Sequence, residues 1–158
     1  MIDARFLEAL DAFIVRAKSA TYVGDGGFAQ SCRPGSHDLK FSDGIWSYLD
    51  SYFGGRDFPG EEVVFADGKA IWAMNYYGSI LISDLITPEQ TGNIIKISLS
   101  RLYKENRFLG GYSHTEGEYV YIDKNSGDLT HFNGKETIVR GNQVSYELVY
   151  HGGLIKND

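Results

Sequence analysis

The sequence predicts an α+β domain in which two helices cover one face of a curved antiparallel sheet of about seven to eight strands. Three observations indicate this fold class. Two segments carry apolar residues at helical spacing, several short segments alternate in the manner of strands, and an order of one helix and four strands occurs twice. A chain of 158 residues that is 42% hydrophobic can form one domain with its own core. We expect a single domain over 1–158, with halves at about 1–82 and 83–158.

The first half begins with a helix that Asp3 caps and that runs to about Ser19. Its expected apolar face consists of Phe6, Leu10, Phe13, Ile14 and Ala17. Glycines at 24–27 (GDGG) end the helix, and no helix follows them directly, as a phosphate-binding loop would require. Strands are expected at about 37–42, 45–53, 60–66 and 69–78, with hairpin turns at Asp43-Gly44 and Asp67-Gly68.

The second half begins with a helix whose start is marked by the sequence TPEQ. Thr87 is a natural N-cap, Pro88 suits the first helical position, and Gln90 completes a capping box. The helix is expected to end near Asn106. Strands should follow at about 108–114, 118–123, 129–139 and 143–151, with turns at 125–127 and 141–142.

The repeated order of elements predicts an internal duplication. Residues 58–81 align with 132–155 without a gap, at an offset of 132 − 58 = 74. Further upstream, Tyr48-Leu49-Asp50 aligns with Tyr121-Ile122-Asp123. The alternative is two unrelated hairpins with similar turn residues. If the duplication is real, the two units should pair into one antiparallel sheet with both helices on the same face. The opposite face would then be concave and could hold a ligand or face a partner.

Composition excludes several classes of function. The formal net charge of −6 opposes contact with DNA phosphates, so we expect no direct nucleic-acid binding. The apolar stretches are too short to cross a membrane, and the N-terminus lacks the basic and apolar regions of a signal peptide. The lone Cys32 cannot form an internal disulfide, which is typical of a reducing cytoplasm. The four histidines have no metal-binding spacing, so we expect no metal and no cofactor.

The candidate site lies around a carboxylate in a row of aromatic residues. In the strand at 45–53, Asp50 shares a face with Trp46, Tyr48 and Tyr52. Together with side chains from the next two strands it could form a polar cluster in an aromatic cleft, and the alternative is a polar patch on a solvated face. The candidate ligand-binding residues are Arg33, Tyr48, Asp50, Glu61, Glu62, Trp72, Asn75 and Tyr77.

Two of these candidates have open alternatives. Glu61 and Glu62 are adjacent and point to opposite faces of a strand, so only one can join Asp50. Arg33 could clamp an anionic group of a ligand, or it could anchor its loop by pairing with Asp25 or Asp38.

Several joined motifs resemble an uncharacterised bacterial domain family of unknown function. They are ATYVGDGG, SCRPGSHDLKF, SYLDSYFGG, FPGEEVVF, DGKAIWAMNYYG and YHGGLI. The family implies no established activity. The motif positions that the chain shares with it, which are the first residues to test, are Asp25, Arg33, Asp38, Tyr48, Asp50, Glu61, Glu62, Trp72, Asn75 and Tyr76. Related domains are sometimes fused to helix-turn-helix regulators, which implies a sensory role. This chain has one helix before the strands, too few for such a module.

These observations predict a cytoplasmic module that binds a small polar or aromatic molecule without catalysis. One alternative is a hydrolase or isomerase that uses Asp50 with Glu61 or Glu62 as acid and base. Another is a protein-interaction domain that forms a homodimer or binds a partner through its sheet face or a free edge.

Overall fold

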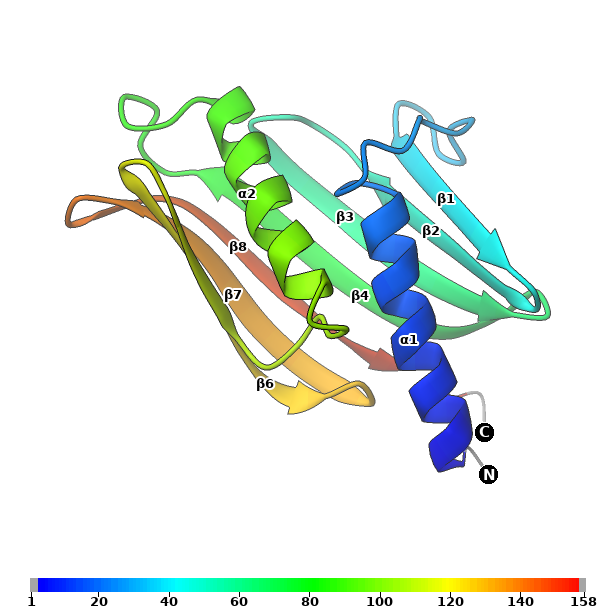
Figure 1. Cartoon of the computed structure of the whole chain (residues 1–158). Coiled ribbons are helices and arrows are strands. Elements are labelled where there is room, and N and C mark those ends of the chain that lie inside the picture. Colours follow the sequence, from blue (N-terminus) through cyan, green and yellow to red (C-terminus); the bar gives the residue numbers. More distant parts are fainter. Residues whose placement is uncertain (1–2, 157–158) are drawn as a thin grey trace.

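Two helices lie across one face of an eight-stranded antiparallel sheet in the computed structural model, which describes residues 3–156 (Figure 1). The elements are α1 (Ala4–Ala20), β1 (His37–Asp43), β2 (Trp46–Tyr52), β3 (Asp57–Ala66), β4 (Lys69–Ile80), α2 (Pro88–Tyr103), β5 (Tyr112–Glu116), β6 (Tyr119–Asp128), β7 (His131–Arg140) and β8 (Gln143–Leu154). The predicted α+β class and both helices on one face are confirmed.

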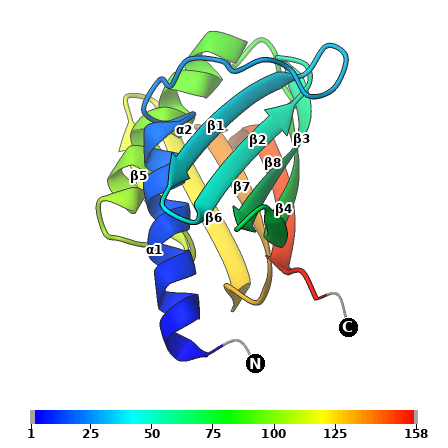
Figure 2. The ribbon, with the colours of Figure 1, turned by 90° about the vertical axis from the view of Figure 1, so that its right-hand side faces the viewer.

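The sheet has the strand order β1-β2-β3-β4-β8-β7-β6-β5 and remains open, with β1 and β5 at its edges. It curls toward the helices, so the concave face is the covered one (Figure 2). The expectation of a concave face opposite the helices was therefore wrong. A twisted sheet wraps around the elements that bury its apolar side chains, and here these are the helices.

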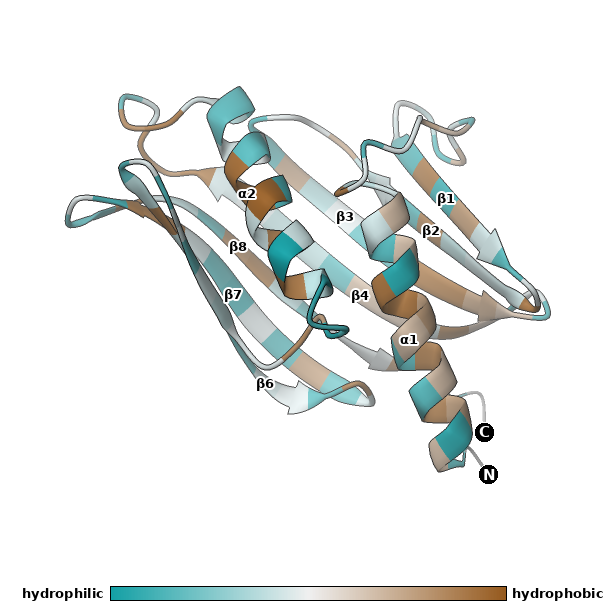
Figure 3. Cartoon of the chain, in the orientation of Figure 1, coloured by the Kyte–Doolittle hydropathy of each residue, from teal (hydrophilic) through white to brown (hydrophobic). Residues whose placement is uncertain are grey.

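Both helices begin at the predicted caps. The Asp3 carboxylate accepts a hydrogen bond of 2.8 Å from the Phe6 amide, and Thr87 and Gln90 form the reciprocal capping box. Apolar bands on both helices alternate with polar ones (Figure 3), and the apolar side chains face the sheet to form the core. On α1 the fully buried residues are Leu10, Phe13, Ile14 and Ala17.

Two predicted boundaries in the second half were wrong. The segment 125–127, expected as a turn, continues β6, where Gly127 pairs with Phe132, and the turn lies at Leu129-Thr130. The Asp128 carboxylate accepts hydrogen bonds from the amide and hydroxyl of Thr130, which fixes the turn there. The strand expected at about 108–114 begins only at Tyr112 as β5, and residues 108–111 form a loop.

The two halves meet where β4 pairs with β8. Tyr76 lies directly opposite Tyr150, and 150 − 76 = 74 is the offset of the sequence alignment. On either side of this pair, Met74 faces Gly152 and Gly78 faces Leu148, so aligned positions exchange places across the pairing. This register suits a pair of similar halves related by a local two-fold axis. The duplication itself stays a prediction.

Candidate functional site

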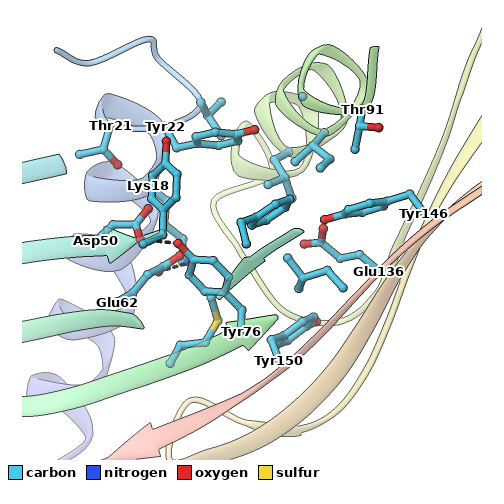
Figure 4. A pocket seen from close by; sticks show the side chains of 18 of the residues that line it. Lys18, Thr21, Tyr22, Asp50, Glu62, Tyr76, Thr91, Glu136, Tyr146 and Tyr150 are labelled. Carbon is cyan, nitrogen blue, oxygen red and sulfur yellow. Dashed lines mark hydrogen bonds and ion pairs between the residues drawn. The ribbon is translucent and has the colours of Figure 1, made fainter. Parts of the chain in front are cut away.

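A cavity of about 210 Å³ lies between the two helices and the concave face of the sheet (Figure 4). For comparison, an engineered apolar cavity of about 150 Å³ holds benzene. The exposed residues that line the cavity of this protein are Gly54, Gly55 and Arg56, in the loop between β2 and β3, and Pro88 at the start of α2. The opening of the cavity therefore lies between that loop and the N-terminus of α2.

The first half contributes a buried acid pair and a lysine to this cavity. Asp50 on β2 lies directly opposite Glu62 on β3, and the two carboxylates are almost fully buried. Lys18, from the last turn of α1, places its Nζ 2.5 Å from Glu62 Oε2. This ion pair is the only polar contact of Glu62 Oε2 among residues 3–156. The Tyr76 hydroxyl donates a 2.7 Å hydrogen bond to Asp50 Oδ1.

The second half contributes an equivalent acid pair without a lysine. Asp123 on β6 lies directly opposite Glu136 on β7, and both are buried. The Tyr150 hydroxyl donates a 2.7 Å hydrogen bond to Asp123 Oδ1, as Tyr76 does to Asp50. Figure 4 shows Glu136 and Tyr150 on the opposite side of the cavity from Asp50 and Glu62.

Glycines on the intervening strands allow these tyrosines to reach the acids. Gly60 lies opposite Tyr76, and a Cβ atom at Gly60 would come within 2.3 Å of the Tyr76 ring. Gly134 lies opposite Tyr150, where a Cβ atom would come within 2.2 Å of the ring. Each ring thus crosses the neighbouring strand at its glycine and reaches the acid on the next strand. A side chain at either glycine position would occupy the space of the ring.

Burial and mutual repulsion favour the protonated forms of these acids. Burial, and next the charge of Glu62, raises the pKa of Asp50 to about 7. Burial, and next the charge of Asp123, raises the pKa of Glu136 to about 8. Burial also raises the pKa of Asp123, although the hydrogen bond from Tyr150 opposes this effect. The cavity therefore holds carboxyl groups that can change protonation near neutral pH.

Two polar atoms that border or line the cavity lack partners. Glu136 Oε2 and the Tyr146 hydroxyl are buried and make no hydrogen bond within residues 3–156. The Tyr121 hydroxyl lies near enough to lower the pKa of Glu136, but the two groups do not meet with hydrogen-bond geometry. Most buried polar groups in proteins have a partner, so these two atoms require an explanation.

A family model for a domain of unknown function (DUF5680) matches residues 50–155. The chain belongs to this family. All four carboxylates of the cavity fall inside the matched range, whereas Lys18 on α1 precedes it. The searches found no match among curated proteins or solved structures.

Two further findings concern metal binding and membrane spans in this DUF5680 chain. Within the described residues, no group of three or more His, Cys, Asp or Glu side chains is placed to hold a metal ion. Over the same range, no helix is both long enough and apolar enough to span a membrane.

Only part of the predicted site comes together. Tyr48, Asp50 and Glu62 line the cavity, so Glu62 rather than Glu61 joins Asp50. Glu61, Asn75 and Tyr77 lie on the opposite, exposed face of the sheet, which divides the predicted cluster. Residues paired across neighbouring strands share a face, and Glu61 pairs with Asn75.

The other two candidates have structural roles. Trp72 is completely buried; its ring stacks on Phe132, and its indole N–H donates to the carbonyl of Leu129. Arg33 anchors its loop by donating to the backbone carbonyl of Ser51 at 2.7 Å, and its guanidinium lies over the Phe53 ring. Neither Trp72 nor Arg33 lines the cavity.

The expected acidic partners of Arg33 were wrong. Asp25 pairs with Lys96 instead. Asp38 is buried, which by itself raises its pKa, but hydrogen bonds from Cys32, Ser36 and Ser51 together hold that pKa below its usual range. Asp38 therefore organises the loop as a hydrogen-bond acceptor and not as a partner of Arg33.

Sequence reasoning did not select Lys18, Glu136, Tyr146 or Tyr150 as site residues, although all four line the cavity. The alignment of the halves contained a signal for three of them, because it superposes Glu136 on Glu62, Tyr146 on Trp72 and Tyr150 on Tyr76. Lys18 gave no such signal. It lies on a helix whose packing angle on the sheet the sequence does not specify.

Proposed function

We propose that this domain binds a small molecule in the cavity between its helices and its sheet, as a sensory module without catalysis. The observation that carries the proposal is a cavity lined by tyrosines in which buried carboxylates, and two polar atoms without partners, converge. Ligand sites in proteins combine such apolar walls with a few placed polar groups.

The energetic cost of burying four carboxyl groups in the cavity supports this proposal. A buried charge is unfavourable unless it is paired, and of the four buried carboxylates only Glu62 forms an ion pair within the described residues, with Lys18. A core built only for stability would be better served by apolar side chains of similar volume. Retention of these groups is expected where they serve a ligand.

The position of the cavity supports a sensory role. Its lining includes Lys18 of α1 and the C-cap residue Thr21 that follows this helix, and Thr91, Ile95 and Tyr103 of α2. A bound molecule would contact both helices, so its presence could change how they pack on the sheet. We propose that the domain acts in the cytoplasm and reports ligand occupancy to a regulatory partner, in keeping with the resemblance to regulator-associated domains.

A thermal-shift screen with a metabolite library tests the proposal. A ligand at about 100 times its Kd should stabilise the native state by about 2.7 kcal/mol. Asp50→Asn should remove this shift, because Asp50 lines the cavity. Glu61→Gln is a matched control, since Glu61 neighbours Glu62 but faces solvent on the other side of the sheet.

Two outcomes contradict the binding proposal. One is a library that produces no shift with the wild-type protein. The other is a ligand shift that survives Asp50→Asn but disappears in Glu61→Gln, which would place binding on the outer face.

One observation favours a second candidate, a hydrolase or isomerase that uses Asp50 with Glu62. Burial and the charge of Glu62 raise the pKa of Asp50 to about 7, a value suited to a general acid near neutral pH. Turnover of a ligand from the screen should then be lost in Asp50→Asn while binding remains. Unchanged turnover in that variant excludes this mechanism.

A further inference from the structure

We propose that the ligand is a small organic cation, a compact molecule with a protonated amine, whose ammonium group binds beside Glu136 and Tyr146. This inference rests on the proposed binding function and specifies its ligand class. Four further features of the cavity carry it.

The first feature is an imbalance of charge. The lining contains the carboxylates of Asp50, Glu62, Asp123 and Glu136, and Lys18 is the only buried cation within the described lining. Lys18 is in contact with Glu62. No ion pair among residues 3–156 involves Asp123 or Glu136, and the charges of Arg107 and Lys18 act on Asp123 only from a longer distance. A bound cation would supply the missing charge and favour the ionised carboxylates.

The second feature is the pair of polar atoms without partners. Glu136 Oε2 and the Tyr146 hydroxyl are more than nine-tenths buried, and Figure 4 shows both side chains directed toward the same part of the cavity. Burial, and next the charge of Glu136, raises the pKa of Tyr146. An ammonium group carries three N–H donors, so it can donate to both oxygens at once. A carboxylate ligand would instead be repelled by the ionised form of Glu136.

The third feature is the aromatic wall. The rings of Tyr22, Tyr48, Tyr103 and Phe108 line the cavity, and aromatic faces attract cations within about 6 Å. Lys18 Nζ already lies 5.6 Å from the centroid of the Phe108 ring. The same wall therefore accommodates one ammonium group of the protein itself.

The fourth feature is the size and lining of the cavity. A space of about 210 Å³ is larger than the benzene-binding cavity of about 150 Å³, so it has room for an organic body of this class with an added amine. Aromatic and aliphatic side chains such as Ile95, Leu99 and Leu148 provide apolar contacts for that body. This lining favours an organic amine over a hydrated metal cation.

Three probes of nearly the same shape but different charge test the inference. Benzylamine, benzyl alcohol and benzoate should be titrated into the full chain by calorimetry at about pH 8, well below the pKa of about 10 of an alkylamine such as lysine. Benzylamine should bind at least about tenfold more tightly than benzyl alcohol, since a charge-assisted hydrogen bond contributes more than a neutral one. Benzoate should not bind.

Two variants localise the binding. Glu136→Gln keeps the shape of the side chain and removes its charge, and it should weaken benzylamine binding about tenfold or more while leaving benzyl alcohol unchanged. Tyr146→Phe removes only the unpartnered hydroxyl and should weaken benzylamine binding less. Glu61→Gln on the outer face is the control and should bind benzylamine as the wild type does. Circular dichroism of each variant verifies the fold.

The outcomes separate this inference from the proposed function. Tighter binding of benzyl alcohol or benzoate than of benzylamine overturns the cationic ligand but retains a binding cavity. Equal benzylamine affinity in wild type and Glu136→Gln overturns the assigned position. Displacement of benzylamine by magnesium ions at equal concentration overturns the organic character of the cation. Failure of all three probes and of the metabolite library overturns both proposals.

Discussion

Replacement of Lys18 by methionine should destabilise the protein more than any exposed charge replacement. The Lys18 side chain is 6% exposed and that of its partner Glu62 is 9% exposed, with 2.5 Å between Nζ and Oε2. Loss of one partner of a buried ion pair typically costs about 3–5 kcal/mol, because it leaves an uncompensated buried charge. The total stability of a domain is only about 5–15 kcal/mol, so this loss would be large.

The loss should depend on pH in a defined direction. The pKa of Asp50 is raised to about 7 and that of Glu136 to about 8, above their values in the unfolded chain. At about pH 5 both groups are protonated in the folded state and add no negative charge beside Glu62. We therefore expect Lys18→Met to lower the free energy of unfolding less at about pH 5 than at about pH 8.

Urea denaturation followed by circular dichroism measures the free energy of unfolding at both pH values, and an unchanged slope shows that the variant differs from the wild type in stability alone. Lys135→Met is the matched control, since Lys135 is half exposed in its ion pair with Glu147 and should contribute no more than about 1 kcal/mol. The double variant Lys18→Met, Glu62→Gln should recover part of the loss. A cost for Lys18→Met below about 1 kcal/mol, or one equal at both pH values, would refute the reasoning.

Three further predictions concern individual residues. Glu136→Gln should reduce the fall in the free energy of unfolding between about pH 5 and pH 8 by up to about 1.4 kcal/mol per pH unit, because the raised pKa of Glu136 makes its ionisation unfavourable to the folded state. Parallel wild-type and variant curves of this free energy against pH, measured by urea titration, would contradict the prediction. Gly60→Ala should push the Tyr76 ring away from Asp50 and lower the free energy of unfolding by about 1–3 kcal/mol. An unchanged denaturation midpoint would show that the ring can move freely. Asp3→Ala should lower stability by about 1 kcal/mol through loss of the helix cap, measured as a decrease in Tm; a Tm equal to that of the wild type would show that the cap is dispensable.

Local signals in the sequence were enough to predict most of the fold. The caps at Asp3 and Thr87 fixed where the helices begin, and Asp67-Gly68 forms its predicted turn, with left-handed backbone at both residues. The turn at 125–127 failed because a glycine can also continue a strand, and Gly127 does so with a φ of 90°. Pairing with β7 determines that Gly127 continues the strand and does not form a turn.

The candidate site was only partly predictable. Side-chain alternation placed Asp50 and Tyr48 on one face of a strand, and both line the cavity. The choice of Glu62 over Glu61 depended on the register between β2 and β3, since a slip of one residue exchanges the faces. Asn75 and Tyr77 were assigned to the cluster without that register, and they lie on the exposed face.

The sequence by itself determined the elements, their order, the side chains that share each strand face, and an acid at equivalent positions of both halves. Only the tertiary structure decided which face the helices cover, that the acids of both halves line one cavity, and that Lys18 reaches Glu62 from α1. The physical reason is that caps, turns and alternation act between near neighbours in the chain. Strand register, sheet curvature and helix packing depend on contacts between distant segments, which minimise exposed apolar surface for the domain as a whole.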